Sequence, residues 1–392
     1  MAVTSPEKLE NVLLSVLNSE EIQSATSGIP AQFTVYPENR QHICELVKLA
    51  VADGLTLIPM GSGSRINSAG EFDIAVSTSK LNEQMEHSPA DMVATIPTGT
   101  AFTTAQSALR KHHQRIALDP PVNDSSTIGG IVSTNDWGTL RHRYGTAKNS
   151  ILATTIVNGD GKIVKAGAKV VKNVSGYDLN KLYIGARGSL GILLDVTFRL
   201  HPLPEQIQTG IIRCDSLDEA LLAASTCSRL PLNVESVELT KSSDWEVTVT
   251  IAGNSETIKI VEESVAENVS WNSESGKSTT KHKVGIYYVK ASIPKSKLKL
   301  FLKSVSYFDS LSLWSLPNVG VCRLSFEDAV QLTRISASVE SSGGFMEVEQ
   351  QPANSHFPRW LITPPGLEWM RRIKSVLDPH GIFAPGILGE DL

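Results

Sequence analysis

The run MGSGSR, residues 60 to 65, closely follows the apolar stretch LTLI, and its residue types and spacing indicate anion-binding chemistry. Alternating glycine and serine leaves several backbone N–H groups unobstructed, and such groups can converge on a phosphate. A P-loop would need Gly-Lys-Ser/Thr opening a helix, and a Rossmann turn would need a third glycine where Ile66 stands. The run therefore predicts a phosphate-binding loop of neither common kind.

Two further glycine-rich stretches occur in the same strand-rich region. The stretch from residue 120 to 149 supplies Gly129, Gly130, Gly138 and Gly145, and a later one supplies Gly188 and Gly191. A single phosphate would not need three such loops. A dinucleotide would, because glycine lets both a pyrophosphate and a flat ring approach the backbone without a Cβ atom in the way.

Length and composition limit the classes of protein that need to be considered. The chain has 392 residues, 41% of them hydrophobic and 20% charged, which is enough for two or three soluble domains with their own cores. A net charge of −5 argues against a general polyanion binder, so nucleic acid is not an expected partner. Any phosphate contact must therefore be local.

The cysteines and the N-terminus indicate the compartment. The four cysteines lack the C-x-x-C spacing of metal and iron–sulfur sites, so we expect free thiols and no metal centre: Cys44, Cys214, Cys227 and Cys322. The sequence has neither a signal-like start nor an apolar run of about 18 residues. We expect a cytoplasmic protein that reaches a membrane only through partners.

Helical and strand patterns surround the glycine-rich loops. Residues 5–18 and 38–52 have helical spacing, and the strand-like TLIPM leads into the first loop. A further helix is expected at 102–112, and a hairpin at 151–167 turns at Asp160-Gly161. Short strands dominate this region, and prolines at 202 and 204 mark its end.

Beyond residue 205 the pattern changes to strand, helix, strand, and it occurs twice. This alternation predicts an antiparallel sheet with helices on one face, as in a duplicated ferredoxin-like unit. The polar stretch NSESGKSTTKHK separates the two halves, and LEWMRRIKSVL predicts a last helix before the tail.

Several motifs then resemble a known family. PMGSGSR, DPPVNDSSTIGGIVSTNDWGTLRHRYG, IVNGDGKIV, KNVSGYDLNKLYIGARGSLGI and the terminal DPHGIFAPG resemble the vanillyl-alcohol oxidase or PCMH-type FAD-binding flavoproteins, and within them the glycolate oxidase group. The resemblance implies an α+β fold, in which a PCMH-type domain of two α/β subdomains carries a ferredoxin-like antiparallel cap domain. The implied segments are an N-terminal helical segment at 1–29, the FAD-binding domain at 30–205, the cap at 206–365, and a helix and tail at 366–392 that return to the FAD-binding domain.

The resemblance also implies the residues that hold FAD. The pyrophosphate loop comprises Met60, Gly61, Ser62, Gly63, Ser64 and Arg65; the flavin and ribityl chain are lined by Ser126, Thr127, Gly129, Gly130, Ser133 and Gly138. Tyr144 and Gly145 support the second loop, and Gly188, Gly191 and Ile192 approach the adenosine side or the flavin edge. Some relatives attach the flavin through a histidine at the position of Ser64, so serine there implies non-covalent FAD.

The candidate catalytic groups are few. A hydroxy-acid dehydrogenase needs a base for the alcohol proton and a cation for the carboxylate, and His142, Arg143 and Tyr144 cluster beside Arg141. Their alternative role is to fix the geometry of their own loop or to contact a phosphate. The His-rich HxGDGNxH-like segment of catalytic members is missing between 205 and 365, where we can name neither base nor cation.

The resemblance implies the FAD-binding subunit of a glycolate oxidase or dehydrogenase complex. Such a complex would oxidise glycolate, or a D-2-hydroxy acid such as D-lactate, to the 2-oxo acid and pass electrons through FAD to an iron–sulfur subunit. A larger FAD-binding subunit and a cysteine-rich iron–sulfur subunit would be its partners. Two alternatives remain open: a stand-alone FAD oxidase or dehydrogenase of an alditol, lactone or hydroxy acid, and a non-catalytic structural FAD subunit.

Overall fold

The chain is divided into two compact units. The computed structural model describes residues 5–26, 28–66, 70–81, 84–169, 177–230, 233–264, 269–272, 285–308, 310–352, 355, 357–389 and 392. The first unit comprises 1–136, 146–203 and 366–392, and the second comprises 137–145 and 204–365.

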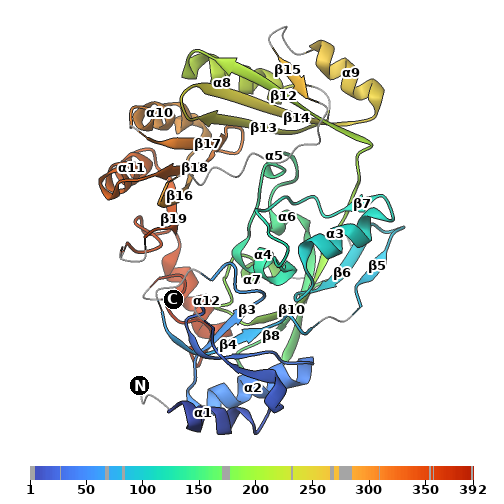
Figure 1. Cartoon of the computed structure of the whole chain (residues 1–392), viewed down its shortest axis with the longest axis vertical. Coiled ribbons are helices and arrows are strands. Elements are labelled where there is room, and N and C mark those ends of the chain that lie inside the picture. Colours follow the sequence, from blue (N-terminus) through green and yellow to red (C-terminus); the bar gives the residue numbers. More distant parts are fainter. Residues whose placement is uncertain are drawn as a thin grey trace. The chain divides into compact units, whose positions relative to one another are not determined.

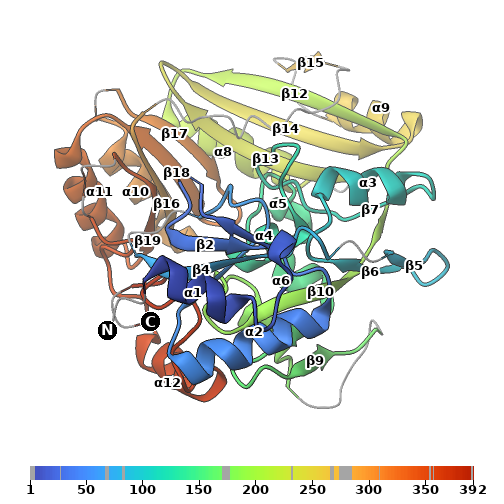
Figure 2. The same ribbon diagram turned by 60° about the horizontal axis from the view of Figure 1, so that its bottom comes forward.

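The first unit begins with a small mixed sheet covered by helices. Its strand order is β1-β2-β4-β3, with β1 antiparallel and the other three parallel: β1 (Ile22–Ser24), β2 (Ala31–Val35), β3 (Leu57–Met60) and β4 (Phe72–Ser77). Figure 2 shows α1 (Pro6–Leu13) and α2 (Arg40–Asp53) beside β2 and β4. Asn39 caps α2 by accepting a hydrogen bond from the backbone N–H of His42, and Gly54 ends it in the left-handed conformation. A single 3₁₀ turn, Ser19–Glu21, precedes β1.

A second, antiparallel sheet completes the first unit. Its order is β5-β6-β10-β8-β9: β5 (Glu86–Ser88), β6 (Val93–Pro97), β8 (Ile151–Val157), β9 (Ile163–Gly167) and β10 (Ile192–Arg199). Its core is shared with α3 (Phe102–Arg110), α4 (Ile128–Thr134) and α7 (Asn180–Tyr183). The remaining elements are β7 (Gln114–Arg115), β11 (His201–Pro202) and α6 (Ala147–Ser150). The hairpin expected at 151–167 is β8 and β9.

The C-terminal tail is part of the first unit. After α12 (Leu367–Leu377), residues 382–384 run beside β3, where Leu57 donates to the carbonyl of Ile382 and accepts from the N–H of Ala384, both at 2.7 Å. Phe383 is fully buried in the core formed by α1, α2 and the first sheet. The tail thus supports the strand that carries the first glycine-rich loop.

The second unit is one eight-stranded antiparallel sheet with helices on one face, and Figure 1 shows α8, α10 and α11 on that face. Each half has the order strand, helix, two strands, helix, strand. The first half contains β12 (Gln206–Cys214), α8 (Leu217–Ser228), β13 (Val234–Lys241), β14 (Trp245–Gly253), α9 (Ser255–Ser264) and β15 (Ser270–Asn272). The second contains β16 (Tyr287–Ser292), α10 (Lys295–Val305), β17 (Ser312–Leu316), β18 (Val321–Phe326), α11 (Ala329–Ser341) and β19 (Phe345–Gln350).

The strand order confirms the duplicated ferredoxin-like unit. The sheet runs β15-β12-β14-β13-β17-β18-β16-β19, so each half has its fourth strand beside its first, and the halves join through β13 and β17. The polar stretch expected between the halves lies, from residue 273 onward, outside the described residues.

Residues 137–145 differ from the expected domain assignment. The expected FAD-binding domain, 30–205, includes them, whereas they cluster with the second unit. Trp137 packs there with Trp314, Leu316 and Val321, and its ring centre lies 6.0 Å from that of Trp314. These contacts join residues far apart in sequence, which explains why local patterns did not indicate them.

Candidate functional site

The first glycine-rich loop leaves the end of β3 in a fixed direction. The backbone N–H of Thr78 donates to the carbonyl of Met60 at 2.9 Å, and the Ser77 hydroxyl donates to the carbonyl of Gly61 at 3.0 Å. A Cβ atom at Gly61 would lie 1.9 Å from Oγ1 of Thr127, a distance that no real side chain tolerates. Glycine at this position therefore permits the close packing of the first loop on the second.

The backbone donors of this loop are available for a ligand. Among the described residues, none accepts a hydrogen bond from the N–H groups of residues 61 to 65. Gly63 has a φ of 79°, which favours glycine and redirects the chain within the loop. Consecutive N–H groups without protein partners are the donor set that a pyrophosphate needs.

The second glycine-rich stretch contains a helix that the sequence analysis treats as loop. α4 starts at Ile128, and the Thr127 side chain caps it by accepting from the N–H of Gly130 at 3.2 Å. Gly129 packs so closely on Thr98 that an added Cβ atom would lie 2.9 Å from its side chain. Glycines 129 and 130 thus form the first turn of a helix, in which Ile131 and Val132 are buried.

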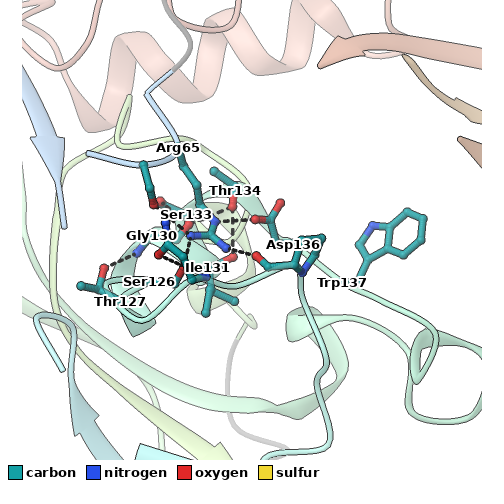
Figure 3. A network of polar contacts seen from close by, with 12 residues as sticks. Arg65, Ser126, Thr127, Gly130, Ile131, Ser133, Thr134, Asp136 and Trp137 are labelled. Atoms are coloured by element: carbon teal, nitrogen blue, oxygen red, sulfur yellow. Dashed lines mark hydrogen bonds and ion pairs between the residues drawn. The ribbon is translucent and has the colours of Figure 1, made fainter. Parts of the chain in front are cut away.

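Arg65 joins the first loop to the second. Figure 3 shows its side chain among Ser126, Gly130 and Asp136, with Nε paired to the Asp136 carboxylate and Nη1 3.1 Å from the Ser126 hydroxyl. Its Nη2 donates to the carbonyl of Pro121 at 2.6 Å. The guanidinium therefore fixes the position of the two loops relative to each other, in addition to lining the cleft described below.

The third glycine-rich loop packs on the same helix. Arg187 donates its backbone N–H to the carbonyl of Ser133 at 2.8 Å, and Gly185 donates to that of Val132 at 3.1 Å. Gly188 has a φ of 78°, and an added Cβ atom would meet Pro59 of β3 at 3.0 Å. All three loops thus converge between β3 and α4.

A cleft lies where the loops meet, and it is partly open to solvent. Of the residues expected to bind FAD, the lining contains Met60, Gly61, Ser62, Gly63, Ser64, Arg65, Thr127, Gly129, Gly130, Ser133, Gly188, Gly191 and Ile192. Within the described parts of the chain, the other expected residues, Ser126, Gly138, Tyr144 and Gly145, lie outside this lining.

Sequence reasoning missed several lining residues that come from strands and from the tail. They are Ile58, Pro59, Ile66, Thr78, Thr98, Thr134, Tyr183, Ala186, Arg187, Leu190, Leu193 and Ile387. Tyr183 is buried, and burial raises the pKa of its phenol, so the hydroxyl stays protonated at neutral pH. No local motif marks these residues, because parallel pairing and loop packing bring them together.

The candidate catalysts lie in the second unit, on the short helix α5 (Arg141–Tyr144). Arg143 donates to the Asn233 side chain at 2.9 Å, and the Tyr144 hydroxyl contacts the Glu235 carboxylate at 2.9 Å. Burial, and then the charge of Lys295, lowers the pKa of His142, which favours a neutral imidazole. Arg143 and Tyr144 thus join α5 to Asn233, directly before β13, and to Glu235 within that strand.

Two family models match the chain. The model described as FAD binding domain matches residues 31–167, and the model described as FAD linked oxidases, C-terminal domain, matches residues 354–388. The first range contains two of the three glycine-rich loops, and the second contains α12 and the tail that supports β3.

Curated relatives include both subunits and larger enzymes. The chain is 24% identical over 359 residues to glycolate oxidase subunit GlcE of Escherichia coli strain K12, covering 90% of this chain and 98% of that protein. It is 27% identical over 213 residues to the mitochondrial D-lactate dehydrogenase [cytochrome] 1 of Saccharomyces cerevisiae, covering 52% of this chain and 36% of that protein. The D-lactate dehydrogenase of Archaeoglobus fulgidus is 28% identical, over 52% of this chain and 47% of its own length.

Solved structures have the same fold. An alkyldihydroxyacetonephosphate synthase matches 97% of this chain and 84% of its own with a TM-score of 0.70 at 15% identity.

The chain is an FAD-dependent oxidoreductase with a PCMH-type FAD-binding domain, and FAD is its cofactor. The part of the chain that the structure describes contains no helix long and apolar enough to cross a membrane.

Proposed function

We propose that this chain is the FAD-binding subunit of a complex that oxidises glycolate or a similar D-2-hydroxy acid, such as D-lactate, to the 2-oxo acid. The observation that supports this most is the similarity to GlcE over 98% of that subunit's length. The D-lactate dehydrogenases match over less than half of their own length, so they support the class of substrate and not the organisation of the enzyme.

The cleft of the first unit holds FAD in this proposal. The N–H groups of residues 61–65, which have no partner among the described residues, bind the pyrophosphate, and the glycines at 129 and 130 let the flavin ring approach the first turn of α4. Arg65 keeps these loops together through Asp136. Ser64 cannot form the linkage of a histidyl flavin, so denaturation releases the chromophore.

The bound flavin would accept the hydride that leaves the carbon carrying the substrate hydroxyl. The groups of this chain bind and orient: the loops fix the cofactor, and the buried apolar residues of the cleft exclude water from it. Two of the three candidate catalysts, Arg143 and Tyr144, make contacts within the second unit that fix α5. A partner that completes the chemistry is therefore part of the proposal.

The proposed partners are a larger FAD-binding subunit and a cysteine-rich iron–sulfur subunit. This chain has four cysteines, all buried and free, and in the described residues no group of histidine, cysteine and acidic side chains could hold a metal. An iron–sulfur relay therefore needs a second chain.

Affinity purification of the chain at its native level tests the proposed complex. We expect a larger flavoprotein and a cysteine-rich iron–sulfur protein to copurify with it in fixed ratio. A chain that is recovered alone, and that oxidises an alditol, a lactone or a hydroxy acid unaided, would establish the stand-alone enzyme instead. If the flavin bound to this chain within the complex is reduced by dithionite but by no substrate, the chain is a structural subunit.

A further inference from the structure

The second unit places an arginine in the middle of the sheet face that its helices leave uncovered. Along β18, Cys322 and Leu324 point into the core under the helices, so Arg323 lies on the opposite face. The register pairs Arg323 with Trp314 of β17 on one side and with Lys290 of β16 on the other. Arg323 is thus flanked by an aromatic ring and by a second cation.

The guanidinium of Arg323 is buried with most of its donors unused. The residue is 5% exposed, and its Nη2 donates to the carbonyl of Trp137 at 3.1 Å. Its Nε and Nη1, which carry three of the five guanidinium N–H groups, have no hydrogen-bond partner among the described residues. A buried charged donor without a partner costs free energy, so this site favours an anion.

Two acidic residues of this face on β19, Glu347 and Glu349, are paired with other cations, and Glu238 of β13 accepts a hydrogen bond from the Trp314 indole at 2.8 Å. Lys290 lies 2.6 Å from Glu347 and 3.3 Å from Glu349, and Arg359 lies 2.9 Å from Glu347. Burial raises the pKa of Glu349, but the charges of Lys290 and Arg323 outweigh burial. The pKa is therefore below its usual value, and this carboxylate is ionised. Glu349 therefore attracts Arg323 at a distance without forming a hydrogen bond to Nε or Nη1.

A second arginine lies over the same tryptophan. The Cζ atoms of Arg141 and Arg323 are 4.2 Å and 4.3 Å from the ring centre of Trp137. Within the described chain, no hydrogen bond or ion pair involves the Arg141 guanidinium, and burial together with the charge of Arg323 lowers its pKa to about 10. The ring attracts both cations but neutralises neither.

We propose that Arg323 and Arg141, held over the Trp137 ring, form a binding subsite for the carboxylate group of a small organic acid. Under the proposed function, on which this assignment of the acid rests, the ligand is the 2-hydroxy acid. A carboxylate fits because its two oxygens accept the charge-assisted hydrogen bonds that Arg323 does not make with any described residue. Its negative charge also relieves the repulsion between the two guanidinium groups.

Oxalate tests this subsite without turnover, because it carries carboxylates and cannot be oxidised as an alcohol. We would titrate it into the FAD-loaded full chain by calorimetry and compare Arg323→Gln with Arg334→Gln, in which an exposed arginine of α11 is changed. We expect binding to the native chain, binding at least about tenfold weaker in Arg323→Gln, and native binding in Arg334→Gln. Ethylene glycol, which lacks the carboxylate, should not bind.

Stability supplies a second readout that a purely structural arginine would not give. Because Nε and Nη1 have no partner in the described part of the chain, Arg323→Gln should unfold at the same or a higher temperature than the native chain without oxalate. Oxalate should no longer raise that temperature. If Arg323→Gln does not fold, Arg141→Gln replaces it and should weaken oxalate binding at least about tenfold.

Native oxalate binding in the folded arginine variant, or no oxalate binding by the native chain, would overturn the subsite. Equal binding of sulfate and oxalate would overturn its assignment to a carboxylate. Loss of oxalate binding in the variant, with no 2-hydroxy acid oxidised by the assembled complex, would support the subsite and reject the proposed function.

Discussion

Gly61→Val is expected to give a folded chain that purifies without flavin. The added Cβ atom would lie 1.9 Å from Oγ1 of Thr127, the residue that caps α4. The first loop and α4 must then move apart, which takes the backbone donors of residues 61–65 away from the ring-binding side of the cleft. We expect FAD affinity to fall by at least about 100-fold, measured by flavin absorbance per chain and by fluorescence titration.

Gly54→Val is the matched control. Gly54 ends α2 with a φ of 67°, and an added Cβ atom meets nothing within 4 Å. Strain at this position should cost roughly 1–2 kcal/mol of stability and leave the flavin content unchanged. Full FAD occupancy in Gly61→Val would contradict the assignment of the loop to FAD binding. Flavin loss in both variants would mean that general destabilisation, and not the loop, causes the loss.

Asp378→Asn is expected to destabilise the first unit by about 3 kcal/mol, as breaking a buried ion pair does. Asp378 is 2% exposed, and its carboxylate accepts from Lys374 at 2.6 Å and from the backbone N–H of Phe383 at 3.0 Å. Lys374 also donates to the carbonyls of Phe383 and Ser189, at 2.6 Å and 2.7 Å. One partly buried ammonium thus joins α12, the tail and the third loop.

Glu368→Gln tests the same type of interaction on the surface of the same helix. Glu368 pairs with Arg372 at 3.1 Å, and both side chains are 64% exposed. Exposed pairs contribute little, so its removal should cost less than about 0.5 kcal/mol. Both changes are followed as the denaturant midpoint at which FAD is released, and equal shifts in the two variants would contradict the role of Asp378.

The sequence predicts the parts of the site that depend on local chemistry. Glycine spacing identifies the first loop because left-handed turns and close backbone packing restrict the residue type at Gly61 and Gly63. The duplicated strand and helix pattern predicts the second unit, since each half repeats one periodicity. By contrast, Gly129 and Gly130 suggest a loop, and α4 forms because Thr127 caps it and its apolar residues are buried.

The features that sequence patterns miss depend on long-range packing. In the segment VCRLSF, Arg323 alternates with buried residues, which is the pattern of a strand with one solvated face. Its burial results from pairing with β17 and from contact with Trp137, 186 residues away in sequence. The sequence therefore gives no sign that the region between 205 and 365 contains a buried cation.

Anaerobic reduction of the bound flavin tests the central claim most directly. The chain is loaded with FAD, glycolate is added without oxygen, and the flavin absorbance is followed before and after the larger FAD-binding and iron–sulfur subunits are supplied. We expect the isolated chain to keep its oxidised spectrum, because no base for the substrate hydroxyl is assigned in it, and the assembled complex to reduce a dye with glycolate. Rapid bleaching of the isolated chain by glycolate or D-lactate would contradict its role as a dependent subunit and make His142 the first residue to test as the base.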